Sequence, residues 1–150
     1  MAAMVESHSP QSRARARSVL QSLDLMSRLL TASCYRHGLN PAQWSALRYF
    51  AEAATKDCTP SAFARAHRAT KGTISQTLMA LTRKGLIEKI TDAKDGRSIT
   101  VKLTAAGVAQ LAQDPWRAFE DVLMKGPDES VRQVVRIAEL LTHAITKDSA

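Results

Sequence analysis

Apolar side chains recur every three to four residues along most of this chain, which is the spacing that places them on one face of a helix. The segment 18–37 shows this spacing most clearly. Its apolar positions are Val19, Leu20, Leu23, Met26, Leu29, Leu30 and Cys34. His37-Gly38 ends the predicted helix, because glycine tolerates the left-handed backbone of a helix stop. Residues 1–17 lack the periodicity and are predicted to be a flexible N-terminal segment.

Three shorter helices are predicted between residues 40 and 85, and each begins at a capping residue. Asn40-Pro41 opens the first, and Thr59-Pro60 opens a short one that reaches about His67. Thr70 caps the third, which ends at Lys84-Gly85. A side-chain oxygen just before the first turn, with proline at the first helical position, is a typical helix start.

After residue 85 the pattern changes from helical to alternating. The segments 86–90 and 98–103 are short runs rich in β-branched residues, and the segment 91–97 between them is polar and rich in turn residues. This order predicts a β-hairpin with a charged tip.

Two further helices are predicted beyond the hairpin. Thr104 caps the first, and Pro115 predicts a break near Asp114 because proline removes a backbone donor. The first helix carries Val108, Leu111, Trp116, Phe119 and Leu123. The second, after Gly126-Pro127, carries Val131, Val134, Val135, Ala138, Leu141 and Ile145.

Together these elements predict a mainly α protein with one small β-hairpin. A winged helix-turn-helix consists, in this order, of a short helix, a turn, a second helix and a hairpin with a basic tip. We assign this fold to residues 38–107. We assign a dimerisation helix to residues 18–37 and further dimerisation helices to residues 108–150.

The net charge of +7 is concentrated in the middle of the chain. Residues 60–102 hold nine Lys and Arg against three acidic residues. A polyanion would bind there, although a merely solvated basic surface explains the charge alone equally well. No segment is long and apolar enough for a bilayer, and no signal pattern opens the chain. With only Cys34 and Cys58, the expectation is a cytoplasmic protein with reduced thiols and no membrane partner.

The start of the helix capped by Thr70 suits the major groove of double-stranded DNA, where base edges present distinct hydrogen-bonding patterns. Capping alone explains Thr70 but not the run of uncharged hydrogen-bonding residues that follows it. The predicted DNA contacts in this helix are Lys71, Thr73, Ser75, Gln76 and Thr77.

Several segments resemble the MarR (multiple antibiotic resistance regulator) family. Asp95-Gly96-Arg97 followed by Thr104-Ala105-Ala106-Gly107 is similar to the wing signature of that family. Residues 39–44, 71–76 and 83–87 resemble its second and recognition helices. The resemblance implies that Arg97 enters the minor groove and that Asp95 orients its guanidinium, although Asp95 also fits a plain turn. It implies phosphate contacts for Lys94 and Arg65, which solvated charge would explain as well.

The resemblance also implies a homodimer formed by the first helix and the last two helices. It implies an inverted-repeat operator, repression, and release by a small aromatic or anionic effector, with no cofactor. The residues most able to line an effector crevice are Tyr35, His37, Trp44 and Trp116, which core packing explains as well.

Two other regulatory readings stay open. One is a redox sensor based on Cys34 or Cys58, and the other is a winged helix that binds only proteins. An enzyme is disfavoured, because no Cys/His cluster has metal spacing and the histidines are scattered. They are His8, His37, His67 and His143.

Overall fold

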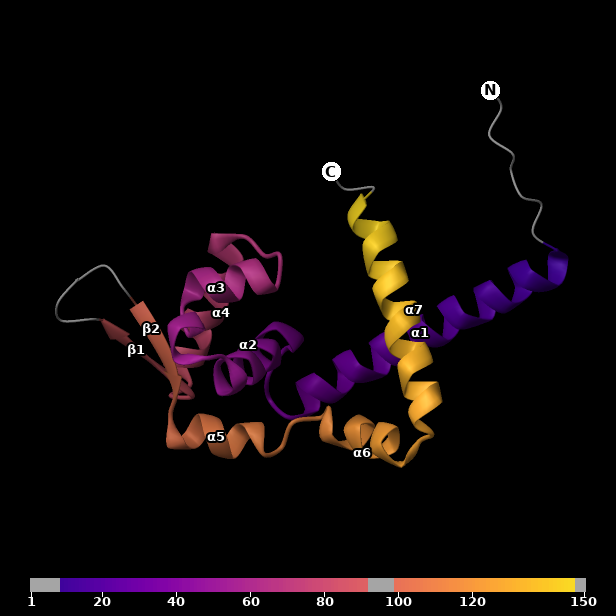
Figure 1. The fold of residues 1–150 in the computed structure, drawn as a ribbon. Coiled ribbons are helices and arrows are strands. Elements are labelled where there is room, and N and C mark those ends of the chain that lie inside the picture. Colours follow the sequence, from indigo (N-terminus) through magenta and orange to yellow (C-terminus); the bar gives the residue numbers. More distant parts are fainter. Residues whose placement is uncertain (1–8, 92–98, 148–150) are drawn as a thin grey trace, which may run out of the picture. The chain divides into compact units, whose positions relative to one another are not determined.

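The structure is a computed structural model that describes residues 9–91 and 99–147 (Figure 1). The chain forms two compact units, divided between Asp114 and Pro115. The first holds α1 (Pro10–Arg36), α2 (Pro41–Glu52), the 3-10 turn η1 (Thr55–Asp57), α3 (Pro60–Ala66), α4 (Lys71–Arg83), β1 (Ile87–Thr91), β2 (Ile99–Leu103) and α5 (Ala105–Leu111). The second holds α6 (Arg117–Lys125) and α7 (Asp128–Lys147).

The predicted helix starts are confirmed between residues 40 and 104. Asn40 forms a reciprocal capping box with Gln43, and the side chains of Thr59, Thr70 and Thr104 each accept a backbone N–H from their own first turn. These caps satisfy amides that a helix leaves without internal partners.

The start of α1 corrects the sequence analysis, which placed it at residue 18. The helix begins at Pro10, and the Ser9 hydroxyl accepts the Ser12 N–H at 3.1 Å. Ser9-Pro10 is the same kind of start signal as Asn40-Pro41. It was missed because the apolar periodicity begins only later along the same helix.

The expected boundary at residue 107 is also wrong, because it falls inside α5. This helix packs against α2 and β2 and therefore belongs to the first unit. The close approach of α5 to the Leu86 backbone depends on Gly107, because a Cβ at this position would lie 2.0 Å from the backbone oxygen of Leu86. The Thr104 hydroxyl adds a second link by donating to the Gly85 carbonyl at 2.6 Å.

The hairpin confirms the alternating pattern. Strands β1 and β2 are antiparallel, with Ile87 opposite Leu103 and Thr91 opposite Ile99. On its other edge β2 is held by the loop before α3, since the Val101 N–H donates to the Cys58 carbonyl at 2.8 Å. The wing residues between the strands, 92–98, lie outside the described residues.

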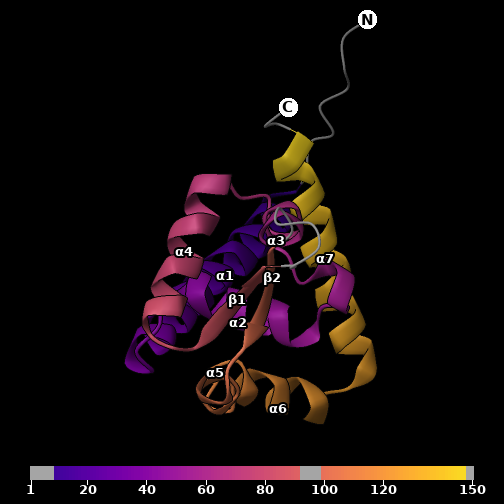
Figure 2. The ribbon, with the colours of Figure 1, turned by 90° about the vertical axis from the view of Figure 1, so that its left-hand side faces the viewer.

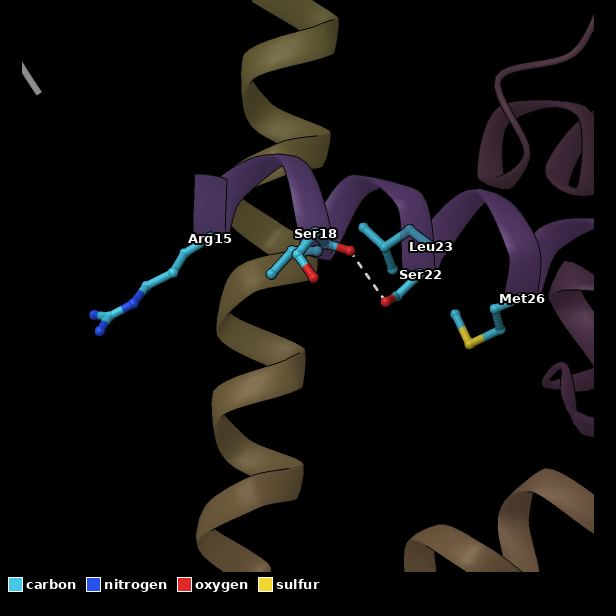
Figure 3. Close-up of a pocket in the computed structure, with 6 residues that line it drawn as sticks. Arg15, Ser18, Ser22, Leu23 and Met26 are labelled. Atoms are coloured by element: carbon cyan, nitrogen blue, oxygen red, sulfur yellow. Dashed lines mark hydrogen bonds between the residues drawn. The ribbon is translucent and has the colours of Figure 1, made fainter. Parts of the chain in front are cut away.

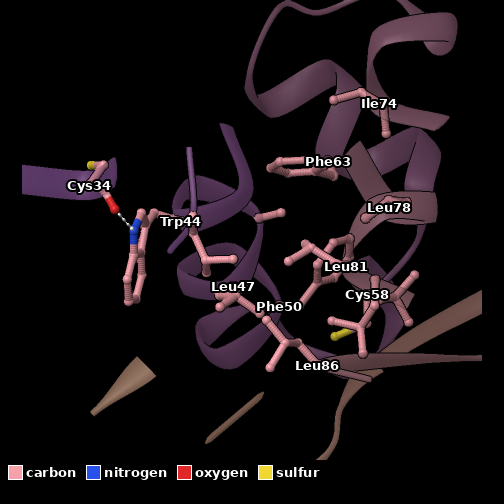
Figure 4. Close-up of a cluster of buried hydrophobic side chains, with 14 residues drawn as sticks. Cys34, Trp44, Leu47, Phe50, Cys58, Phe63, Ile74, Leu78, Leu81 and Leu86 are labelled. Atoms are coloured by element: carbon pink, nitrogen blue, oxygen red, sulfur yellow. Dashed lines mark hydrogen bonds between the residues drawn. The ribbon is translucent and has the colours of Figure 1, made fainter. Parts of the chain in front are cut away.

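One hydrophobic core joins α2, α3, α4 and the hairpin (Figure 4). Its most deeply buried large side chains are Trp44, Phe63, Leu47, Leu78, Leu81 and Val101. The core fixes one side of α4 against α2, α3 and β1, and it leaves the other side at the edge of the lobe (Figure 2).

In the second unit, α6 and α7 are amphipathic but no described residue from 116 to 146 is buried. The large exposed apolar side chains of this unit are Trp116, just before α6, and Phe119, Val122, Leu123, Met124, Val134, Val135, Ile137, Leu140 and Ile145. Among the described helices, none is long and apolar enough to cross a membrane.

Candidate nucleic-acid interface

The turn between α3 and α4 sets the angle at which α4 is presented. The Ala69 N–H donates to the Ala64 carbonyl at 3.1 Å and the Arg68 N–H to the Arg65 carbonyl at 3.3 Å. These two bonds form a Schellman motif that ends α3. Arg68 occupies the left-handed position of this motif, with a φ of +48°. The corresponding positions after α1 and α4 are the glycines Gly38 and Gly85.

The outward side of α4 is a single surface, which we call the α4 face. Its midline is formed by residues spaced three to four apart, so they lie above one another on the helix. These residues are Gly72, Gln76, Met79 and Arg83, with Lys71, Ser75 and Thr82 exposed beside them. The buried side of the same helix carries Ile74, Thr77, Leu78 and Leu81.

Most of the predicted α4 contacts lie on exposed surface. Lys71, Ser75 and Gln76 are exposed, and so is Thr73, whose hydroxyl shares a 2.9 Å hydrogen bond with that of Thr70. Thr77 corrects the prediction: it is 9% exposed and its hydroxyl donates to the Thr73 carbonyl at 3.0 Å. It faces inward because it lies three residues after Ile74, on the core side of the helix.

The other predicted contacts divide between α3 and the wing. Arg65 is exposed in the last turn of α3, next to the turn that leads into α4. Lys94, Asp95 and Arg97 all lie within residues 92–98, outside the described residues.

Sequence reasoning missed Gly72, Met79, Arg83 and Arg68. The first three are found by extending the outward helical spacing from Gln76 in both directions. Gly72 matters because a Cβ there would meet no protein atom closer than the Thr70 hydroxyl at 3.9 Å. Packing inside the chain therefore does not require a glycine. Arg68 gave no sequence signal, since its backbone conformation normally belongs to glycine.

Three of the four predicted effector residues lie in the first unit, and they differ in exposure. Trp44 is fully buried and its indole N–H donates to the Cys34 carbonyl at 3.2 Å, so it is a core residue. His37 packs edge-on to Trp44 with ring centroids 6.4 Å apart, and Tyr35 is 62% exposed. Trp116 belongs to the second unit.

Other described residues of the first unit line hollows. One, of about 400 Å³, runs along α1 alone and is mostly apolar (Figure 3). It is lined by Arg15, Ser18, Val19, Ser22, Leu23 and Met26. The other, of about 540 Å³, lies between α2, η1, β2 and α5 and includes Phe50, Cys58, Lys102, Val108 and Leu111.

Neither cysteine is placed as an exposed reactive thiol. Both are buried and unpaired with each other. Burial raises the pKa of the Cys34 thiol, and the nearby Arg48 guanidinium only partly opposes this shift. The Cys58 thiol donates to the Ala53 carbonyl at 3.5 Å. Among the described residues no group of His, Cys, Asp and Glu could hold a metal ion.

The helix-turn-helix, the α4 face and the antiparallel hairpin define a winged helix-turn-helix protein. The family model of the MarR family matches residues 37–98, from the end of α1 to the residue before β2. Over this lobe, the chain is similar to the MarR family. This likeness to transcription regulators, rather than the absence of any residue, supports the prediction that the chain is not an enzyme.

Solved structures share the fold over most of the chain. A MarR family transcription regulator, SP03579, has a TM-score of 0.71 at 18% identity, with 91% of each chain covered. Staphylococcus aureus MepR in a complex with DNA has a TM-score of 0.65 at 20% identity, covering 82% of this chain and 96% of that one. A probable transcriptional regulator from Pseudomonas aeruginosa has a TM-score of 0.64 at 25% identity, covering 82% and 93%. No curated protein matches the chain.

Proposed function

We propose that this protein is a transcription regulator of the MarR family that binds double-stranded DNA sequence-specifically, with the α4 face in the major groove. The observation that carries the proposal is the α4 face itself. It is exposed along the helix, rich in hydrogen-bonding side chains, and held on its other side by the core. In this arrangement Ser75 and Gln76 contact base edges, and Lys71 and Thr73 contact the backbone near the helix start. MepR, which shares the fold, has been solved with DNA bound.

The wing supplies the second set of contacts in this proposal. Arg97 enters the minor groove, oriented by Asp95, while Lys94 and Arg65 bind phosphates. Support comes from the likeness of Asp95-Gly96-Arg97 to the wing signature, and from the paired strands β1 and β2 that flank these residues in the sequence.

A homodimer explains the apolar surface that the chain leaves uncovered. On α1 the exposed apolar residues include Val19, Leu20, Leu25, Met26 and Leu29. The second unit exposes ten more, and two helices alone cannot enclose them. A two-fold dimer buries such faces and presents two copies of α4, so the operator is an inverted repeat with half-sites about one helical turn apart.

We propose repression as the regulatory outcome, with a small aromatic or anionic effector releasing the DNA. Tyr35 and His37, at the end of α1, are the side chains of the first unit assigned to effector binding. Trp116 is a separate candidate in the second unit. Trp44 contributes only by supporting His37 from the core.

The test is selection of DNA fragments by the purified protein, followed by a gel-shift assay with random competitor DNA. The proposal predicts recovery of an inverted repeat that resists competition. Retention of all fragments equally would contradict sequence-specific binding, and no retention would favour a winged helix that binds only proteins.

A further inference from the structure

Met79 has an unusual place on α4. It lies on the midline of the α4 face, three residues after Gln76 and four before Arg83, and it is 48% exposed. Every other exposed residue of α4 is polar or glycine. Met79 is thus the one large apolar side chain on this surface.

The core does not account for Met79. The inward side of α4 is filled by Ile74, Leu78 and Leu81, and Met79 is absent from the buried cluster that they join. Single exposed apolar residues are common on proteins and carry no meaning by themselves. The position of Met79 is informative, because its neighbours along the midline of the α4 face are the side chains proposed to face DNA.

The chemistry of methionine restricts what it can recognise there. Its thioether is at most a weak hydrogen-bond acceptor, so it cannot read base edges as Gln76 or Arg83 can. Its flexible, polarisable chain packs well against small apolar groups. The major groove offers one such group, the C5-methyl of thymine.

We propose that Met79 is a specificity residue that recognises a thymine by packing against its C5-methyl group. The inference rests on the proposed placement of α4 in the major groove. Gln76 and Met79 are three residues apart, which is roughly 4.5 Å along a helix axis. The thymine therefore lies one or two base pairs from the base that Gln76 contacts, in each half-site.

The experiment uses the best selected operator and replaces its thymines one at a time by deoxyuridine, which removes the methyl group and keeps the base pairing. Fluorescence anisotropy then gives the dissociation constant of the full-length protein for each duplex. For the wild type, one thymine in each half-site should show about a four-fold loss, the effect of one methyl-sized apolar group. Met79→Ala should bind the thymine and deoxyuridine duplexes equally, whereas Met79→Leu should keep the preference.

Val108→Ala is the matched control, because it shortens an exposed apolar side chain on α5 of the same lobe. It should discriminate thymine from deoxyuridine as the wild type does. Specific binding by the wild type with no deoxyuridine effect at any position would overturn the inference, as would an effect that persists in Met79→Ala. Failure to select any sequence would instead contradict the proposed function itself. The wild-type measurement can still overturn the inference if Met79→Ala does not fold.

Discussion

The Arg48 guanidinium binds both carboxylate oxygens of Asp114, at 2.5 and 2.8 Å. The pair joins α2 to the last residue of the first unit, and the two side chains are only 16% and 8% exposed. It therefore fixes the point at which the chain leaves the winged helix lobe.

Asp114→Ala should lower the free energy of unfolding by about 3 kcal/mol, because it leaves a buried guanidinium without its partner. The double variant Arg48→Met, Asp114→Leu should lose much less stability, since neither buried charge then remains. Urea denaturation of both variants measures the difference. Equal losses, or a loss below about 0.5 kcal/mol for Asp114→Ala, would show that the pair behaves like an exposed one.

Substitution by alanine at two glycines of the lobe should change the stability of the fold in opposite directions. Gly107→Ala should destabilise the fold by about 3 kcal/mol or more, because its Cβ would overlap the Leu86 backbone. Gly72→Ala should stabilise the fold by about 0.5–1 kcal/mol, since it replaces an exposed helical glycine without a contact.

The same Gly72→Ala variant should nevertheless bind its operator less well, by about 1–3 kcal/mol, if the helix start lies close to the bases. Thermal unfolding and operator titration on one preparation test both effects. Unchanged affinity would mean that the first turn of α4 does not approach the DNA closely.

Arg68→Gly should stabilise the protein by about 0.5–1 kcal/mol, because it removes the cost of a left-handed backbone at a side chain other than glycine. It should also weaken DNA binding, since it removes an exposed charge beside the start of α4. Arg36→Gly, which removes an exposed charge at the end of α1, is the control for charge alone. A destabilised Arg68→Gly protein would indicate that the arginine side chain holds the turn.

The caps and the hairpin followed from the sequence because they depend on local chemistry. Asn40, Thr59, Thr70 and Thr104 each act within their own first turn, so a short segment contains the whole signal. Tertiary features were harder to predict. The partner of Asp114 is 66 residues away on α2, and the sequence does not show that these two charges meet.

In the candidate site, too, local features could be predicted from the sequence and tertiary ones could not. The exposed side of α4 could be predicted from helical spacing, and the error at Thr77 came from treating a polar residue as an outward one. Its hydroxyl is satisfied inside its own helix, which lets threonine occupy a core-facing position. Trp44 shows the converse, because a residue suited to a ligand site is instead needed to close the core beneath α1.

Cys34 should react slowly with iodoacetamide at pH 8 in the native protein and rapidly in urea. Burial raises its pKa, so the thiolate that reacts is scarce in the folded state and becomes abundant only at a higher pH. Rapid labelling of native Cys34 would support the redox alternative. So would a reversible, peroxide-dependent loss of DNA binding that Cys34→Ser abolishes.

The central claim, that α4 reads the sequence while the wing adds affinity, is tested most directly by paired salt titrations on the selected operator and on random DNA. Gln76→Ala should cost about 1–3 kcal/mol on the operator and little on random DNA, because it removes a base contact. Arg97→Ala should weaken binding to both and make the salt dependence shallower, because it removes a charge that displaces counterions. These roles of α4 and the wing are contradicted if Arg97→Ala keeps the wild-type affinity and salt slope while Gln76→Ala weakens both duplexes equally.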